Sequence, residues 1–390
     1  MKTFYKTNKN SIFNRNVFGK SLSSQLDKKA KYCNGAIGLI NNGNICYFNS
    51  VIQNLKNVYL LSKYLLSSYI FFDKGGFSFK YCELLSNLIN QDKYQYTDPG
   101  ELLSKLKEIS SLFRFEEQND CCFCIIYILN LLKKETRKFT KQKMFKEIQT
   151  YGFFSEKEKE LFSKYQNKLY ERRNSPIIEL FYVFQENIYK CQKCQYTNIS
   201  FQGTNVLNLP IMKINNKEIK SIEEAISYYQ KEQNHFNEKD FNCPKCSANK
   251  ITTQSKIISL PQVLIINLMR FGEKKIIYNH NVEAPNFLDM ENLIMNRNYA
   301  NYKYELIGFI KYIEEENSVH NIAICKNFFD NVWYVYDDSK IFNINNSKYI
   351  SNHNIDTSNG LLFFYGRKGE YITEETKDFI IKKAAEIRKE

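Results

Sequence analysis

Two pairs of closely spaced cysteines place the strongest constraint on how this chain of 390 residues folds. They are Cys191-Gln-Lys-Cys194 and Cys243-Pro-Lys-Cys246, with residues 195–242 between them. Each C-x-x-C turn presents two thiolates to one point, and two such turns complete the tetrahedral four-thiolate set of a structural Zn²⁺ site. We therefore predict zinc at Cys191, Cys194, Cys243 and Cys246, with no coordination position left open for catalysis. Redox pairs or unligated thiols are the alternatives.

The segment between the two pairs is longer than a compact zinc ribbon requires. From Ile178 onward the pattern is typical of strands, and Ser221 to Gln230 predicts a helix. We therefore expect a ribbon of paired strands that is interrupted by one helix.

A second constraint comes from Gly38–Leu55, where an Asn- and Gly-rich turn runs directly into an apolar-periodic helix with Cys46 at the junction. A thiol in the first turn of a helix lies near unpaired backbone N–H groups and the positive end of the helix dipole, which favour the thiolate. Asn41 is a candidate donor to the oxyanion formed in acyl transfer. Local chemistry alone also allows Cys46 to be a small buried hydrophobic residue at a helix start.

The last third of the chain predicts a β-hairpin that brings a histidine beside an aspartate. The strands are His320–Asn327 and Val332–Asp338, joined by a short polar loop. The start of the first strand of an antiparallel pair lies beside the end of the second, so His320 should lie next to Asp337 or Asp338. A single histidine at a strand start is otherwise a surface or satisfied core residue. Together with the thiol of Cys46, the pattern favours a Cys-His-Asp triad.

Composition excludes several other classes of function. The hydrophobic content of 43% and charged content of 25% are ordinary for a globular protein. Despite a net charge of +13, the basic residues are dispersed and form no RNA-binding motif, so we do not expect a nucleic-acid partner. No run is long and apolar enough to span a bilayer, and we expect no membrane partner. Eleven cysteines without a disulfide framework indicate a reducing compartment, the cytoplasm or the nucleus.

Two further helices matter for the organisation of the chain. Asp120 is a predicted N-cap of a dense apolar helix whose three cysteines, Cys121, Cys122 and Cys124, are better explained as core than as metal ligands. Residues 373–388 predict an amphipathic helix with acidic residues early and basic residues late, as the helix dipole favours.

The segment around Cys46 resembles the cysteine box of the ubiquitin-specific proteases, the papain-like deubiquitinases, whose pattern is G-L-x-N-x-G-N-T-C-Y-x-N-S-x-x-Q-x-L. The matching residues are Gly38, Leu39, Asn41, Gly43, Asn44, Cys46, Tyr47, Asn49, Ser50, Gln53 and Leu55, whereas Ile45 replaces the usual threonine. The resemblance implies that Cys46 is the nucleophile and Asn41 the oxyanion-hole donor.

Other boxes of the same family are similar but altered. Gln118 and Asp120 match Q-Q-D-A-x-E-F, which implies that they bind the substrate tail and that Asp120 pairs with an arginine of the ubiquitin C-terminus; a helix cap and nothing more is the alternative for Asp120. The histidine box implies His320 as base and Asp337, four residues after the single tryptophan, as its orienting acid, with Asp338 as an auxiliary. Asn321 follows His320 where the family has the tyrosine of G-H-Y.

The resemblance implies an α+β papain-like cysteine protease with a helical thumb lobe, a β-rich palm lobe and zinc-ribbon fingers that grip ubiquitin. We expect a basic, poorly ordered tail at residues 1–30, a catalytic domain at 31–368 with fingers at about 185–255, and the amphipathic helix at 369–390. The implied function is thiol-dependent hydrolysis of the isopeptide bond after the last glycine of ubiquitin, with ubiquitin and ubiquitinated proteins as partners and no organic cofactor. The alternatives are an inactive ubiquitin-binding scaffold and a protease for another ubiquitin-like modifier.

Overall fold

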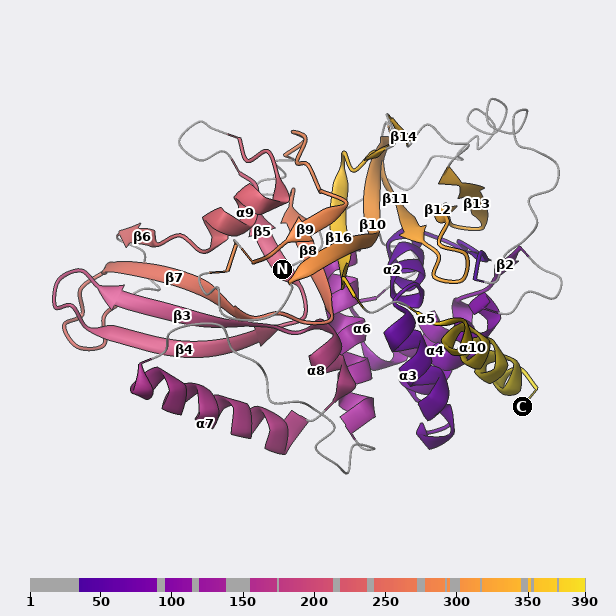
Figure 1. The fold of residues 1–390 in the computed structure, drawn as a ribbon, viewed down its shortest axis with the longest axis horizontal. Helices are drawn as coiled ribbons and strands as arrows, with labels where there is room; N and C mark the ends of the chain where they lie inside the picture. Colours follow the sequence, from indigo (N-terminus) through magenta and orange to yellow (C-terminus); the bar gives the residue numbers. More distant parts are fainter. Residues whose placement is uncertain are drawn as a thin grey trace.

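The chain folds into a helical lobe, a sheet lobe and a separate long sheet that projects away from both (Figure 1). This computed structural model describes residues 35–89, 95–113, 119–137, 155–173, 175–212, 218–236, 242–271, 278–291, 293–294, 302–315, 318–344, 350–351, 354–369 and 372–389. The tail at 1–30 and Gln118 lie outside the described residues. The predicted α+β architecture, with two lobes and a finger-like ribbon, is confirmed.

The helical lobe is built around α2, which starts at Cys46 and packs against α3, α6 and the sheet lobe. Every residue of α2 is buried, so this helix has protein on all sides. The helices of the lobe are α2 (Cys46–Lys56), α3 (Tyr59–Ser68), η1 (Tyr69–Phe71), α4 (Phe77–Ile89), α5 (Gly100–Ile109), α6 (Cys121–Thr136), α8 (Pro176–Phe181) and α10 (Glu374–Ile387).

The sheet lobe is one eight-stranded sheet with the order β13-β12-β11-β10-β16-β8-β5, in which β9 pairs with β10. Its strands are β5 (Leu207–Pro210), β8 (Val263–Met269), β9 (Phe287–Asp289), β10 (Lys303–Glu315), β11 (Ser318–Lys326), β12 (Trp333–Asp337), β13 (Lys340–Asn343) and β16 (Gly360–Arg367). The predicted hairpin is confirmed as β11 and β12, which pair antiparallel with Ala323 opposite Tyr336.

Alternation along the central strands divides the hydrophobic core between the two faces of this sheet. On β10 and β16, Ile310 and Leu362 join the core of the helical lobe, whereas their neighbours Phe309 and Phe363 face the opposite side. There they pack with α9 (Ile222–Tyr229) and β9. Because side chains alternate across a strand, this two-sided burial fixes the register of the sheet and therefore of the residues at its edge.

The projecting sheet has the order β4-β3-β7-β6 and consists of long antiparallel strands (Figure 1). They are β3 (Val183–Cys191), β4 (Thr197–Thr204), β6 (Gln233–Phe236) and β7 (Lys250–Ser259). Helix α7 (Glu156–Arg173) runs along β4, with the rings of Phe162 and Phe201 5.1 Å apart. The predicted helix between the cysteine pairs is confirmed as α9, capped by Ser221.

The remaining short pairs are β1 (Gly38–Leu39) with β2 (Tyr96–Thr97), which is parallel, and β14 (Ile350–Ser351) with β15 (Asn354–Ile355). Helix α5 begins directly after β2, with Pro99 as its N-cap. Asp98 Oδ1 accepts a hydrogen bond from the Gly100 N–H at 2.8 Å at the start of this helix.

Candidate active site

Cys46 is the first residue of α2 and lies where the helical lobe meets β11 of the sheet lobe. Its side chain is buried, with a residue exposure of 5%. The turn before it contains Gly43 at φ +150°, a conformation that favours glycine. Ile45 is the N-cap of this helix and supplies no side-chain bond, while Asn41 Oδ1 accepts from the Ile45 N–H at 3.3 Å.

His320 lies on β11 and links Cys46 to the end of β12. Its ring forms a side-chain hydrogen bond with Cys46, and its Nε2 lies 2.6 Å from Asp337 Oδ1. The register of the sheet sets this arrangement. His320 lies near the start of β11, where it pairs with Ile313 of β10. Asp337 is the last residue of β12, and the end of β12 lies toward the start of β11 because the two strands are antiparallel. The fold thus brings together the thiol, imidazole and carboxylate that the sequence suggested.

The charges of the three groups reinforce one another. Burial lowers the pKa of His320, but hydrogen bonds and charge from Asp337 and Cys46 outweigh it and raise that pKa from 6.5 to about 11. Burial raises the pKa of Asp337, yet the bond and charge of His320 and the charge of Lys340 lower it overall. The arrangement therefore favours the protonated imidazole of His320 and the ionised carboxylate of Asp337.

The neighbouring Asp338 contacts the other side of the site. Its Oδ2 accepts from Asn41 Nδ2 at 2.7 Å and its Oδ1 from Asn49 Nδ2 at 2.8 Å. Burial raises the pKa of Asp338, against the opposing effect of these two bonds. His320, Asp337 and Asp338 are also close enough to hold a metal ion, but the two amides already occupy both oxygens of Asp338.

The backbone around Asp338 fixes the distance between the two lobes. Asp338 has φ +54°, and its carbonyl accepts from the Leu39 N–H at 2.9 Å. A Cβ on Gly38 would lie only 2.6 Å from the Ser339 carbonyl oxygen, so only glycine permits this approach. The Asn-rich turn is thereby held directly against the end of the hairpin.

Asn49 and Asn321 also contact groups of the site, although neither was predicted from the sequence as a site residue. Asn49 follows Cys46 by almost one helical turn and binds Asp338. Asn321 is buried, and its Nδ2 lies 3.9 Å from Cys46 Sγ. The signal for Asn49 was its spacing from Cys46 on the helix; for Asn321 it was the departure from the G-H-Y pattern.

Asp120 lies at the start of α6, and its described contacts are those of a helix cap. Its Oδ1 accepts from the Cys122 N–H at 2.7 Å, and its carbonyl accepts from the Cys124 N–H. The adjoining Asn119 donates to the Tyr47 hydroxyl at 3.3 Å, which ties this end of α6 to α2. Asp120 is exposed as a residue, but its carboxyl group is turned toward the helix start, where burial raises its pKa against the opposing effect of the backbone bonds.

The cysteines after Asp120 belong to the core. Cys121, Cys122 and Cys124 are all buried, and burial raises the pKa of each thiol. A thiol that stays protonated is a poor metal ligand and a poor nucleophile, because both roles require the thiolate. These residues are therefore apolar packing residues, as the sequence analysis expected.

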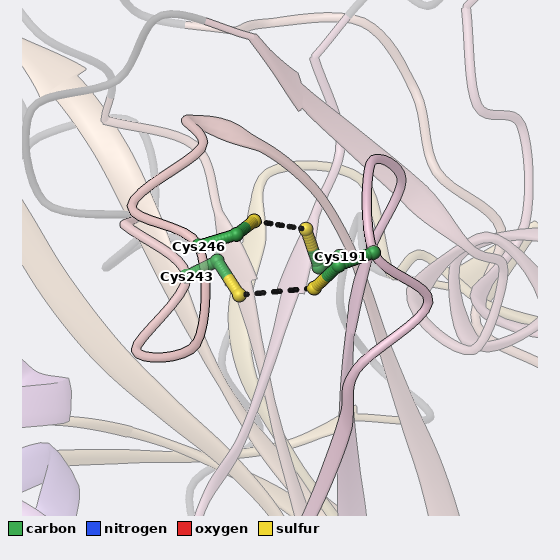
Figure 2. A group of neighbouring side chains, drawn as sticks. Cys191, Cys243 and Cys246 are labelled. Carbon is green, nitrogen blue, oxygen red and sulfur yellow. Dashed lines mark hydrogen bonds between the residues drawn. The ribbon is translucent and has the colours of Figure 1, made fainter.

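Cys191, Cys194, Cys243 and Cys246 meet at the far end of the projecting sheet, on two tight turns that face each other (Figure 2). Cys191 Sγ lies 3.6 Å from Cys246 Sγ, and Cys194 Sγ lies 3.6 Å from Cys243 Sγ. All four sulfurs lie within 4.8 Å of one another. A tetrahedral zinc with Zn–S bonds of about 2.3 Å needs sulfurs about 3.8 Å apart, so the cluster fits this ion.

The two turns have the same backbone geometry. Gln195 and Ser247, each the residue after a C-x-x-C pair, have φ +58° and +55°. Each donates its N–H to the carbonyl of the first cysteine of its pair, at 3.0 and 2.8 Å. The N–H of Lys245 also points to Cys243 Sγ at 3.4 Å, a contact that stabilises a thiolate. The two turns therefore present their sulfurs in a geometry that is compatible with a metal ion.

Among the helices of the described residues, none is long and apolar enough to cross a membrane.

Comparisons with known proteins agree with this architecture. The sequence matches the ubiquitin carboxyl-terminal hydrolase family over residues 37–365. It is 24% identical over 350 residues to ubiquitin carboxyl-terminal hydrolase 2 of Rattus norvegicus, covering 86% of this chain and 54% of that protein. It is 25% identical over 369 residues to ubiquitin carboxyl-terminal hydrolase 4 of Saccharomyces cerevisiae, covering 85% of this chain and 39% of that protein. The chain thus spans about half or less of the length of these relatives.

Solved structures with the same fold include the SAGA DUB module Ubp8/Sgf11/Sus1/Sgf73 bound to ubiquitin aldehyde, with a TM-score of 0.63 and 20% identity over 90% of this chain and 74% of that one. A further structure of the Ubp8-Sgf11-Sgf73-Sus1 SAGA DUB module gives a TM-score of 0.62 and 21% identity, over 86% of this chain and 68% of that one. The fold and the family match over most of its length show that the chain belongs to the ubiquitin carboxyl-terminal hydrolase family.

Proposed function

We propose that the chain is a thiol-dependent deubiquitinase that hydrolyses the isopeptide bond after the C-terminal glycine of ubiquitin. The observation that carries this proposal is the continuous set of contacts from Cys46 through His320 to Asp337, which joins three distant segments of the chain in one site. Family membership supports ubiquitin as the substrate class. A solved neighbour bound to ubiquitin aldehyde supports it as well.

In the proposed first half-reaction, His320 holds the proton of Cys46 and the Cys46 thiolate attacks the isopeptide carbonyl carbon. The high pKa of His320, to which the charges of Asp337 and Cys46 contribute, supports such a resting ion pair. The S–C bond forms while the carbonyl π electrons move to oxygen. His320 then donates its proton to the lysine nitrogen as the C–N bond breaks, which leaves a thioester on Cys46.

Asn41 is the proposed donor to the oxyanion, together with the backbone N–H of Cys46. One N–H of the Asn41 amide binds Asp338 Oδ2, and this bond orients the group and leaves its second N–H for the substrate oxygen. A donor that is already oriented needs little reorganisation when charge develops on the oxygen. The auxiliary role of Asp338 is therefore to hold the oxyanion donor, while Asp337 orients His320.

In the second half-reaction, water attacks the thioester. Neutral His320 accepts one proton from that water as the C–O bond forms, and the C–S bond then breaks to release the C-terminal carboxylic acid of ubiquitin, which loses the second proton to solvent and leaves as a carboxylate. The Cys46 thiolate and the His320 imidazolium are then restored.

We also propose that zinc at Cys191, Cys194, Cys243 and Cys246 stiffens the projecting sheet as fingers that hold ubiquitin, and that residues 31–368 are the catalytic unit. With four protein ligands the ion would have a structural role only.

Gln118 and Asp120 are proposed to bind the ubiquitin tail. Thiolates at both sites need a reducing compartment, so we propose that the protein acts in the cytoplasm or nucleus.

A ubiquitin probe with a C-terminal electrophile tests the hydrolase proposal. We expect covalent labelling at Cys46 that is lost in Cys46→Ala and retained in Cys82→Ala, which removes a buried thiol from α4. The second candidate is a scaffold that binds ubiquitin without cleaving it, favoured by Val319 and Asn321 in place of the family's glycine and tyrosine. Binding without labelling would support that scaffold and contradict the hydrolase.

A further inference from the structure

The side chain of Asn321 is the least expected group beside the nucleophile. It lies on β11, opposite Tyr312 of β10 and next to His320, and it is 5% exposed at the interface where α2 packs on the strand. Its Nδ2 points to Cys46 Sγ at 3.9 Å. Its Oδ1 is buried and has no hydrogen-bond partner among the described residues.

A buried carbonyl without a partner destabilises a fold, and an apolar side chain of the same shape would avoid that cost. The favourable contact that offsets this cost is the one between Asn321 Nδ2 and Cys46 Sγ. An N–H donor stabilises a sulfur anion more strongly than a neutral thiol, because the acceptor charge strengthens the hydrogen bond. The Asn321 amide should therefore favour the thiolate form of Cys46 over the thiol form.

We propose that Asn321 is a positioning residue that holds the Cys46 sulfur as a thiolate through its amide N–H. The proposal rests on the proposed function only in taking Cys46 as the nucleophile. It assigns a role to a residue at which this chain departs from the G-H-Y pattern.

Other titratable groups at the site stay constant in the test. His320 on β11 contacts Cys46, Asp337 and Asp338 lie behind it at the end of β12, and Tyr47 neighbours the thiol on its own helix. The variants below change none of these four groups. A change in the reactivity of Cys46 with pH can therefore be assigned to residue 321.

The experiment measures the rate at which iodoacetamide alkylates Cys46 between pH 4 and 10, with the modified peptide quantified by mass spectrometry and no ubiquitin present. Asn321→Leu keeps the branched shape and removes the donor. We expect its midpoint pH for alkylation to rise, so that alkylation near pH 6 is about three- to tenfold slower, since one unit corresponds to a factor of ten. Asn321→Asp adds a negative charge and should raise the midpoint further.

Thermal unfolding separates this role from a purely structural one. Because Asn321→Leu removes a buried carbonyl without a partner, its Tm should equal or exceed that of the wild type. Asn205→Leu is the matched control: Asn205 is also buried, with an Nδ2 that has no partner among the described residues, but it lies between β4 and β5. Its alkylation profile should match the wild type.

An unchanged or lowered midpoint in Asn321→Leu would overturn the proposal, since a lowered midpoint would mean that the carbonyl oxygen faces the thiol. Asn321→Ala, which only removes atoms, decides the question by the same criterion if the leucine variant does not fold. A chain that shows the shift yet fails to react with the ubiquitin probe refutes the hydrolase proposal and leaves this one standing.

Discussion

Asp337 and Asp338 are adjacent in sequence but act on different partners. Asp337 binds His320, and the pKa of its carboxyl is lowered, whereas Asp338 binds two neutral amides, and burial raises its pKa. The left-handed backbone at Asp338 turns its side chain toward Asn41 and Asn49. One dipeptide at the end of β12 thus contacts both His320, the proposed base, and Asn41, the proposed oxyanion donor.

Replacing Asp338 by Asn should therefore slow catalysis without unfolding the protein. Asn tolerates positive φ, but it has one acceptor oxygen where Asp338 has two, so its NH₂ group would face the NH₂ group of Asn41 or Asn49 and Asn41 would be oriented less well. Loss of an oxyanion donor lowers kcat by about 10²- to 10³-fold, so we expect a decrease of about tenfold or more when the donor is only misoriented. The measurement is kcat for release of a fluorophore from the ubiquitin C-terminus.

Asp330→Asn is the control, because Asp330 accepts bonds from Tyr334 and Val332 at the other end of the same hairpin. It should keep wild-type kcat. Equal rates for Asp338→Asn and the wild type would show that Asp338 does not position the oxyanion donor.

The ion pair of His320 and Asp337 should make stability depend on pH in a defined window. The pKa of His320 is raised from 6.5 to about 11, so its contribution is complete below pH 6.5 and is lost as pH rises through about 11. The pKa of Asp337 is lowered, so its contribution is present above its ordinary value near 3.8 and is lost as pH falls through the lowered value. The full effect lies between these limits.

Urea unfolding of the wild type and Asp337→Asn from pH 3 to 10 tests this expectation. The difference in the free energy of unfolding should be largest between about pH 4 and 6.5, and should shrink on both sides. We expect at most about 1 kcal/mol, because the Asp337 side chain is 37% exposed and solvent screens the pair. A difference that stays constant across this range would mean that the pair is not ionised as described.

At the residue scale, the sequence predicted the groups whose positions follow from local rules. Cys46 follows from a turn that enters a helix, and the contact of His320 with Asp337 follows from the ends of a hairpin. The roles of Asp338 and Asn321 could not be derived in that way. They depend on a positive φ after β12 and on the packing of α2 across β11, which are tertiary features.

Among the elements, α10 shows how an amphipathic pattern becomes part of the fold. Its residues Ile380, Ala384 and Ile387 are buried against α3 and α4. Lys377 Nζ also binds the Phe329 carbonyl at 3.0 Å, in the turn between β11 and β12. The helix lies beyond the family match at 37–365, yet it touches the hairpin that carries His320 and Asp337.

The sequence could predict that α10 is a helix but not what it covers. Acidic residues in its first turn and the Thr373 cap are local signals, and both are present in the structure. Its contacts with α3 and α4 join segments about 300 residues apart, and an amphipathic stripe does not name its partner. The hairpin of β11 and β12 was easier to predict, because the short turn between its strands also makes them neighbours.

Truncating a buried side chain of α10 should destabilise the whole lobe. Ile380 is fully buried, so Ile380→Ala should lower the free energy of unfolding by about 2–5 kcal/mol through lost burial and a cavity. Lys382→Ala, on the exposed face of the same helix, should change it by no more than about 0.5 kcal/mol. Urea unfolding followed by circular dichroism measures both.

If Ile380→Ala were as stable as Lys382→Ala, the helix would not be docked on α3 and α4 in solution. A second readout connects the helix to the site. The Ile380→Ala variant should lose labelling by the ubiquitin probe only at temperatures where its unfolding begins, because the helix acts by supporting the fold rather than by contacting the nucleophile.

For the whole molecule, the two candidate sites lie in different parts of the chain and depend on different interactions. The contacts of the proposed active site join α2 to β11 and β12. The four cysteines cluster where β3 ends at Cys191, on the sheet that projects away from the two lobes (Figure 1). The sheet itself pairs β3 with β4 and β7 along nearly its full length. Loss of zinc should therefore disorder the end of this sheet and leave Cys46 and His320 in place.

Cys194→Ser tests this separation. It removes one of four thiolate ligands, and we expect the zinc content measured by mass spectrometry to fall from about one ion per chain to well below that value. Because the proposed fingers hold ubiquitin, KM for a ubiquitin substrate should rise about tenfold or more. The rate of Cys46 alkylation by iodoacetamide should stay at the wild-type value, since this reaction needs only the contacts around Cys46 and His320.

Cys82→Ser is the control, because Cys82 is a buried cysteine outside both sites, and this variant should leave zinc content and KM unchanged. If Cys194→Ser slowed alkylation of Cys46 as much as it raised KM, the metal would be supporting the entire fold, and the two sites would not be independent.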